Sequence, residues 1–180
     1  MDLFRGKYRI SSARLANWDY GSNAFYFVTI CSKDRQPYFG EIKDDNETQY
    51  LASLRATIIG GIAADYWGQI PANFPFVELD EFVVMPDHIH GILLFNKLAD
   101  SGWQINKFGP QSNNLASVIR GFKGGLKSFA TTNGIDFNWQ PRFYDRVIRN
   151  SDELNRIRKY IQGNPANWIL EKDNRENLYR

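Results

Sequence analysis

One stretch carries more information than any other part of the chain: residues 84–93, Val84-Met85-Pro86-Asp87-His88-Ile89-His90-Gly91-Ile92-Leu93. Its two histidines are the only ones among 180 residues, and they lie two apart in a run of apolar, β-favouring side chains. Side chains at i and i+2 of a strand project from the same face, so we expect His88 and His90 side by side, with Ile89 directed away. Two neutral imidazoles placed in this way can bind one divalent metal ion, although histidine pairs also occur on surfaces without a metal.

Apolar runs around this stretch predict an antiparallel sheet. Residues 76–85 and 88–95 are two strand candidates joined by a tight connection, which is typical of a hairpin. Two further runs, residues 24–31 and 143–148, are rich in aromatic and β-branched side chains. We therefore expect at least four strands.

Three stretches show the three- and four-residue spacing of apolar side chains that is typical of amphipathic helices. They are residues 49–67, 114–130 and 151–163, the last one stopped by Pro165. The order strand, helix, strand, strand, helix, strand predicts an α+β fold. We expect a ferredoxin-like sandwich, with an antiparallel sheet, helices on one face, and a C-terminal helix that carries Tyr160.

Size and composition predict a single domain over residues 1–180, with a core at about 20–165 and a tail at 166–180. We expect loops at residues 37–46 and 96–114. No apolar run approaches the roughly 20 residues of a membrane span, and the only cysteine, Cys31, can form no internal disulfide. These features predict a cytoplasmic protein that does not bind a membrane.

Basic residues are concentrated downstream of the histidines. The formal net charge is only +2, so their distribution matters more than the total. Between residues 115 and 160, nine basic residues stand against the four acidic residues Asp136, Asp145, Asp152 and Glu153. This excess indicates either an ordinary solvated surface or a surface that binds DNA. Besides Arg158, the basic residues are Arg120, Lys123, Lys127, Arg142, Arg146, Arg149, Arg156 and Lys159, our candidates for DNA binding.

The last helix offers a nucleophile and a further metal ligand. Tyr160 and Asn164 lie four residues apart, on nearly the same side of the helix. A tyrosine can attack as a covalent nucleophile once deprotonated, and nearby cations favour that form. The amide oxygen of Asn164 could complete a metal site begun by the two imidazoles. Plainer roles exist: Tyr160 could simply pack its ring, and Asn164, which precedes Pro165, could end the helix.

Three blocks of the sequence resemble the REP-associated tyrosine transposases, which are single-tyrosine transposases of the HUH nuclease superfamily. The first block is FYFVTI at residues 25–30, followed by FGEI at 39–42. The second is VVMPDHIHG at residues 83–91, which contains the His-hydrophobic-His motif. The third is WQPRFYDRVIR at residues 139–149, leading into YIQGNP at 160–165. The likeness spans about residues 8–170.

This resemblance implies metal-dependent cleavage and rejoining of single-stranded or hairpin, REP-like DNA through a 5′-phosphotyrosine intermediate. It implies Tyr160 as the nucleophile, and His88, His90 and Asn164 as ligands of Mg²⁺ or Mn²⁺. It is compatible with a monomer or a homodimer. It also implies the ferredoxin-like fold.

Other functions remain open on the sequence alone. A rolling-circle replication initiator-like nickase has the same histidine pair and tyrosine, and a non-catalytic DNA-binding protein could have kept the fold. A histidine-triad nucleotide hydrolase needs a third alternating histidine, but position 92 is Ile92, and Cys31 alone is too few thiolates for a structural zinc site. In any protein that binds single-stranded DNA, Trp103 or Trp139 would be expected to stack on bases.

Overall fold

We describe the protein from a computed structural model that places residue 15 and residues 17–44, 52–98 and 112–170. The first half contains β1 (Phe25–Cys31), the 3-10 turn η1 (Lys33–Arg35), β2 (Gly40–Asp44), β3 (Ala52–Ala56), α1 (Ile58–Gly68) and α2 (Ile70–Asn73). The second half contains β4 (Val77–Val84), β5 (His88–Phe95), α3 (Leu115–Thr132), β6 (Tyr144–Ile148) and α4 (Ser151–Leu170). No helix in these ranges is long and apolar enough to cross a membrane.

The centre of the fold is a four-stranded sheet in the order β4-β5-β1-β6, and every neighbouring pair is antiparallel. β5 and β1 are the inner strands, so their side chains are covered on both faces. The register places Thr29 opposite His90 and Cys31 opposite His88. Because side chains alternate along a strand, these four residues share one face of the sheet. The predicted α+β fold is confirmed.

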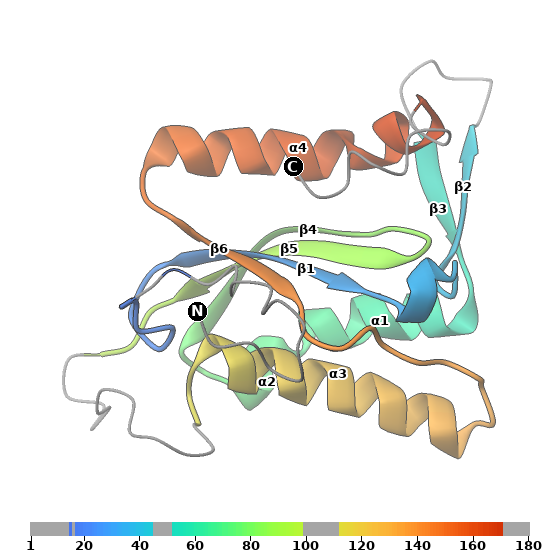
Figure 1. Ribbon diagram of the computed structural model, residues 1–180, viewed down its shortest axis with the longest axis horizontal. Helices are drawn as coiled ribbons and strands as arrows, with labels where there is room; N and C mark the ends of the chain where they lie inside the picture. Colours follow the sequence, from blue (N-terminus) through green and yellow to red (C-terminus); the bar gives the residue numbers. More distant parts are fainter. Residues whose placement is uncertain (1–14, 16, 45–51, 99–111, 171–180) are drawn as a thin grey trace, which may run out of the picture.

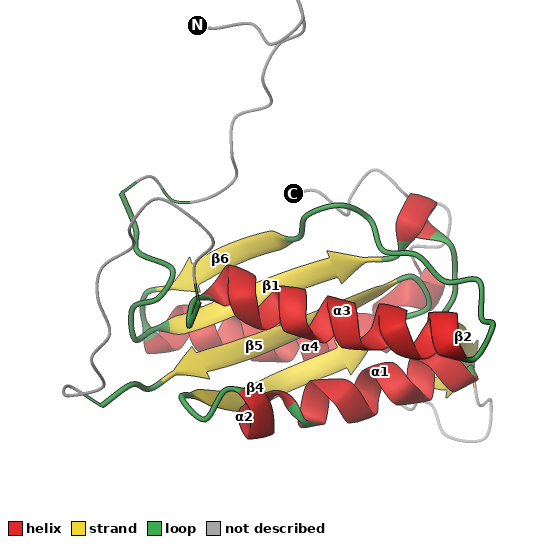
Figure 2. Cartoon of the chain, turned by 90° about the horizontal axis from the view of Figure 1, so that it is seen from below, coloured by secondary structure: helices red, strands yellow, loops and turns green. Residues whose placement is uncertain are grey.

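Helices cover both faces of this sheet. α1 and α3 lie against one face and α4 against the other (Figure 1), and a view from below shows α1 and α3 side by side across the sheet (Figure 2). The α1–α3 layer is centred on Trp67, which is fully buried and packs edge-on against Phe122 at a centroid distance of 5.3 Å. This face therefore holds the main apolar core.

α4 packs on the opposite face through its own apolar stripe. Leu154, Ile157 and Ile161 contact Phe27 and Ile92 in a second, smaller core. At the helix surface, the Arg158 guanidinium also bonds both oxygens of Asp80 on β4, with N···O distances of 2.8 and 2.5 Å. These contacts fix α4 over the strand that carries the histidines.

Two predicted segments were wrong. Residues 52–56, which we expected inside a helix, form β3, and β3 pairs with β2 in the predicted loop 37–46. The close approach of these strands requires glycine at position 40, because a Cβ there would lie 2.3 Å from the carbonyl oxygen of Arg55. The helix begins only after Thr57, whose side chain accepts a hydrogen bond from the Gly60 amide and so caps it.

The end of the last helix also differs from the prediction, which placed residues 166–180 in a tail. Pro165 lies inside α4, and the helix continues to Leu170. A proline removes one backbone hydrogen bond and crowds the preceding turn. The final turns nevertheless stay on the sheet, where the Trp168 ring lies 5.8 Å from the His88 ring.

Candidate active site

The two histidines lie side by side on β5, beneath α4. His88 is fully buried and His90 is 4% exposed. Their rings are 4.4 Å apart and nearly perpendicular, and the two Nε2 atoms approach to 2.9 Å. The strand geometry therefore directs both Nε2 atoms to a single point, as the two-residue spacing predicts.

The outer nitrogens of both imidazoles are held by neighbouring side chains. His88 Nδ1 donates to Asp87 Oδ1 at 2.7 Å, and the other oxygen of Asp87 pairs with Arg35 Nε at 3.0 Å. Because a carboxylate can only accept, Nδ1 of His88 carries the proton and Nε2 keeps its lone pair. His90 Nδ1 lies 2.8 Å from Thr29 Oγ1, a hydroxyl that can either donate or accept. Such partners orient imidazoles that bind metals.

Burial keeps both imidazoles neutral. It lowers the pKa of His88, although the adjacent Asp87 carboxylate opposes the shift. It lowers the pKa of His90 well below the ordinary value, and the neighbouring His88 adds to the effect. A neutral imidazole has a free lone pair on one nitrogen, so both side chains are in the form that binds metal ions.

Tyr160 reaches this pair from α4. Its hydroxyl lies 3.3 Å from Nε2 of His90, and its ring stands edge-on to the imidazole at a centroid distance of 5.2 Å. The side chain is 45% exposed, because Tyr160 lies at the margin of the helix face that packs on the sheet. A phenol that contacts His90 and is also partly exposed to solvent is accessible to an external substrate.

Asn164 lies on the same side of α4, one turn after Tyr160. The next position on that face, Trp168, packs near His88, while Tyr160 packs on His90. Asn164 is therefore bracketed by two residues that contact the histidines. It is 8% exposed, and its side chain makes no hydrogen bond to another described residue. Its amide is available as a ligand.

The donor atoms of this cluster fit a divalent metal ion. Octahedral ligand bonds of about 2.1 Å place adjacent donors about 3.0 Å apart, and the two Nε2 atoms are 2.9 Å apart. Across the described ranges, no group of three or more His, Cys, Asp or Glu side chains could hold a metal ion. The nearly buried amide of Asn164 adds an oxygen donor on the α4 face that packs over the two histidines.

The predicted DNA-binding residues fall on two sides of the sheet. Arg146, Arg149 and Arg156 line one groove between β6 and α4. Lys159 is exposed on α4, and Arg142 is exposed just before β6. Arg120, Lys123 and Lys127 lie on α3, across the sheet from Tyr160.

Two of the α3 lysines have structural partners. Lys123 Nζ donates to the carbonyl oxygens of Gln140 and Arg142 at 2.7 and 3.0 Å. Lys127 Nζ donates to the carbonyl oxygen of Phe137 at 2.7 Å. These bonds tie α3 to the segment before β6, so the two ammonium groups are already engaged within the fold.

Several residues around the site were not found from the sequence. Two of them could have been found from the sequence: Thr29 is a polar residue in an otherwise apolar strand, and Asp87 adjoins the first histidine. Arg35 gives no local signal, since its role depends on a contact between distant segments. The stacking candidate Trp139 instead packs against the Phe137 ring at 4.8 Å and donates its indole N–H to the backbone at 3.0 Å. Trp103 lies outside the described residues.

Comparison with known proteins supports both the fold and a family. No protein-family model matches the chain. A solved REP-associated tyrosine transposase, bound to a REP hairpin, has the same fold: its TM-score is 0.54 at 21% sequence identity, over 86% of this chain and 73% of that one. An uncharacterized protein of Haemophilus influenzae is 36% identical over 167 residues, which cover 87% of this chain and 88% of that protein. This chain therefore belongs to the same protein family as the Haemophilus influenzae protein.

Proposed function

We propose that this protein cleaves and rejoins single-stranded or hairpin DNA, with Tyr160 as the nucleophile. One observation carries the proposal: the Tyr160 hydroxyl is 3.3 Å from His90 Nε2, and that atom is 2.9 Å from His88 Nε2. A phenol beside two convergent imidazoles, with one side open to solvent, suits attack on a phosphodiester held at the metal site. The fold shared with a transposase bound to a REP hairpin favours a REP-like hairpin as substrate.

The proposed reaction exchanges one phosphoester for another. The Tyr160 oxygen attacks the scissile phosphorus, the bond from phosphorus to the 3′ oxygen breaks, and the phenol proton ends on that 3′ oxygen. The products are a 5′-phosphotyrosine and a free 3′-hydroxyl. Because no phosphoester is lost, a 3′-hydroxyl from another strand can reverse the step and join DNA without ATP.

His88, His90 and Asn164 would hold the divalent ion, Mg²⁺ or Mn²⁺. When bound, such an ion polarises the phosphate and stabilises its added negative charge in the transition state. Asp87 and Thr29 would keep the two imidazoles in position. Burial beneath α4 would exclude water from the histidine side of the site, while the exposed edge of Tyr160 admits the strand.

Basic side chains near α4 would position the DNA backbone. Five of them lie on or near α4, which carries Tyr160, and the neighbouring strand β6: Arg142, Arg146, Arg149, Arg156 and Lys159. By contrast, Arg120, Lys123 and Lys127 would contact only DNA that extends round the sheet. The protein would work on this DNA as a monomer or as a homodimer.

The direct test is trapping of the covalent intermediate. Wild-type protein incubated with end-labelled hairpin DNA and Mn²⁺ should give a labelled adduct on a denaturing gel. Tyr160→Phe should abolish the adduct and strand cleavage, and leave the melting temperature nearly unchanged, because the residue is 45% exposed and its hydroxyl makes one long contact, at 3.3 Å. His88→Ala should reduce cleavage at least a hundredfold at saturating metal, since the ion would lose one of its ligands.

A matched control separates this effect from the loss of any tyrosine. Tyr66→Phe removes a hydroxyl on the opposite side of the sheet and should leave the adduct intact. A persistent adduct in Tyr160→Phe would remove Tyr160 from the role of nucleophile. DNA binding without adduct formation in the wild type would instead identify a non-catalytic DNA-binding protein.

A further inference from the structure

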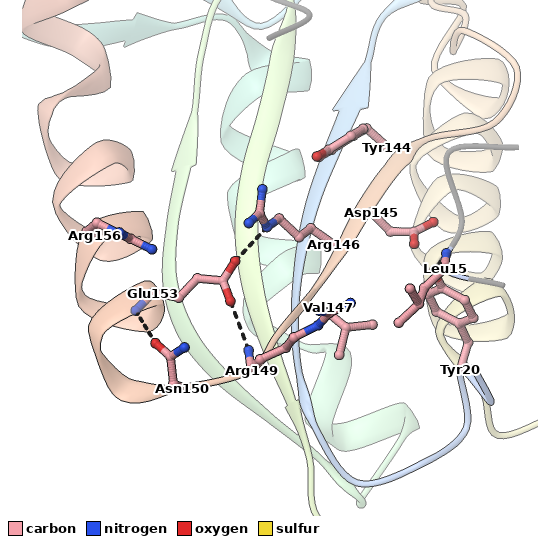
Figure 3. Close-up of a pocket in the computed structure, with 10 residues that line it drawn as sticks. All are labelled: Leu15, Tyr20, Tyr144, Asp145, Arg146, Val147, Arg149, Asn150, Glu153 and Arg156. Atoms are coloured by element: carbon pink, nitrogen blue, oxygen red, sulfur yellow. Dashed lines mark hydrogen bonds and ion pairs between the residues drawn. The ribbon is translucent and has the colours of Figure 1, made fainter. Parts of the chain in front are cut away.

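An open groove lies beside the site, along the edge strand β6 and the first turns of α4, and it extends round β6 to Leu15 and Tyr20. It has a volume of about 440 Å³, and its walls include Tyr144, Arg146, Arg149 and Arg156. β6 is the edge strand of the sheet, which leaves this side uncovered. Figure 3 shows Tyr144 and Arg146 on the side of β6 that faces α4.

One buried ring, that of Phe27, lies between the groove and the tyrosine site and contacts residues of both. Phe27 lies 5.4 Å from the His90 ring, and 6.3 Å from each of the rings of Tyr160 and Tyr144. Both tyrosines stand edge-on to Phe27, and both are nearly half exposed, at 45% and 46%. Tyr144 therefore presents an aromatic surface one ring away from the proposed nucleophile.

The charge that this groove presents to solvent is positive. Its two acidic residues, Asp145 and Glu153, are only 5% and 6% exposed. The Glu153 carboxylate accepts from Arg146 Nε at 2.6 Å and from the Arg149 amide at 3.0 Å (Figure 3). Arg149 is exposed, and its guanidinium makes no ion pair with a described residue.

Arg156 adds a second available guanidinium, closer to Tyr160. It too is exposed and has no ion pair within the described ranges. It lies four residues before Tyr160 on one helix face, which is about 6 Å along the axis. The groove therefore combines exposed cations with an aromatic ring, and both Arg156 and Tyr144 lie near the helix turn that carries the phenol. This combination is typical of sites for single-stranded nucleic acid, where cations meet phosphates and rings stack on bases.

We propose that this groove binds the single-stranded nucleotides adjoining the phosphate that Tyr160 attacks. One base stacks on Tyr144, and Arg149 and Arg156 hold phosphates. This inference rests on the proposed function for the position of the scissile phosphate. It assigns to Tyr144 the stacking role that the sequence suggested for the tryptophans.

The test measures binding separately from cleavage. The full chain is titrated, with a chelator present, against random-sequence single-stranded DNA by fluorescence anisotropy. Tyr144→Ala should raise Kd about ten-fold, while Tyr144→Phe, which keeps the ring, should bind like the wild type. The same strand without bases should bind both Tyr144→Ala and the wild type equally. Arg149→Ala/Arg156→Ala should lower the salt slope by about 1.4, or about 0.7 per lost phosphate contact.

Phe82→Ala is the matched control, because Phe82 is 36% exposed and faces Trp67 on the other side of the sheet. It should leave Kd unchanged. An unchanged Kd in Tyr144→Ala, an equal loss in Tyr144→Phe, or an unchanged salt slope would overturn the proposal. Tighter binding of duplex DNA or of polyglutamate would also overturn it, in favour of another ligand.

The two proposals can fail independently. Adduct formation with a Kd insensitive to Tyr144→Ala refutes the groove alone. Binding that depends on Tyr144, in a protein that forms no adduct on any hairpin or single strand, refutes the cleavage reaction and leaves a nucleotide-binding groove.

Discussion

Replacing Gly91 with alanine should destabilise the protein through a single steric contact. Gly91 follows His90 on β5, and an added Cβ would lie 2.2 Å from Cζ2 of Trp67, with two further indole carbons at 2.8 and 2.9 Å. Nonbonded carbons come to rest about 3.5–4.0 Å apart. The indole would have to move by more than 1 Å, but Trp67 is fully buried and held between Phe122 and Phe82.

Two opposing effects set the magnitude. Overpacking of a close-packed core costs about 1–3 kcal/mol, and the very short contact favours the upper end. Alanine is preferred over glycine inside a strand by only about 0.5–1 kcal/mol. The free energy of unfolding should therefore fall by about 2 kcal/mol. For a domain of this size that corresponds to a melting temperature lower by about 4–8 °C, measured by calorimetry.

Two companion variants identify the cause. Gly124→Ala, on α3, has nothing within 4 Å of its added Cβ and should stabilise the protein by about 1 kcal/mol or less. Trp67→Phe removes the crowding atoms and breaks no hydrogen bond within the described ranges, where the indole nitrogen has no partner. In that background Gly91→Ala should cost at least 1 kcal/mol less than in the wild type. Melting of Gly91→Ala at or above the wild-type temperature would refute the steric reasoning.

The main sheet could be predicted because its strands carry their own signal. A run of apolar, β-branched residues marks a buried strand, and the structure places β5 at residues 88–95, as expected. The short strand β3 carries no such signal. Apolar residues at 51, 54, 58 and 62 fit a helical stripe, and only the distant partner β2 makes residues 52–56 a strand. The local spacing of apolar residues does not show which distant segments pair with each other.

In the candidate site, too, the local relations could be predicted from the sequence and the contacts between distant segments could not. Spacing alone places His88 beside His90, and Tyr160 on one helix face with Asn164, because both relations are local. The distance of 3.3 Å between the Tyr160 hydroxyl and His90 Nε2 depends on how α4 docks across the sheet, because the two residues are 70 positions apart in the sequence. The surroundings of Tyr144 and Arg35 are not set by local sequence either. Their exposure and partners follow from β6 being an edge strand and from η1 folding back on β5.

Two further predictions concern the histidine pair. Burial lowers the pKa of His88 and His90, so below about pH 6.5 the unfolded chain binds more protons than the folded one, and the free energy of unfolding should decrease as the pH falls. Urea unfolding between about pH 7 and pH 5 should show that the free energy of unfolding falls by at most about 1.4 kcal/mol per pH unit for each histidine. An equal pH dependence in the double variant His88→Gln/His90→Gln would show that the loss arises from other groups. Asp87→Asn keeps the shape of the side chain but removes the negative charge of the group that accepts the hydrogen bond from His88 Nδ1. If the amide oxygen keeps that bond, the amide NH₂ group faces Arg35, which is also a donor. Calorimetric titration should therefore show that Asp87→Asn binds Mn²⁺ about 10–100-fold more weakly than the wild type. Glu41→Gln, which changes an exposed carboxylate, is the control and should bind Mn²⁺ like the wild type. Equal affinity in Asp87→Asn and the wild type would mean that the carboxylate does not position the imidazole for metal.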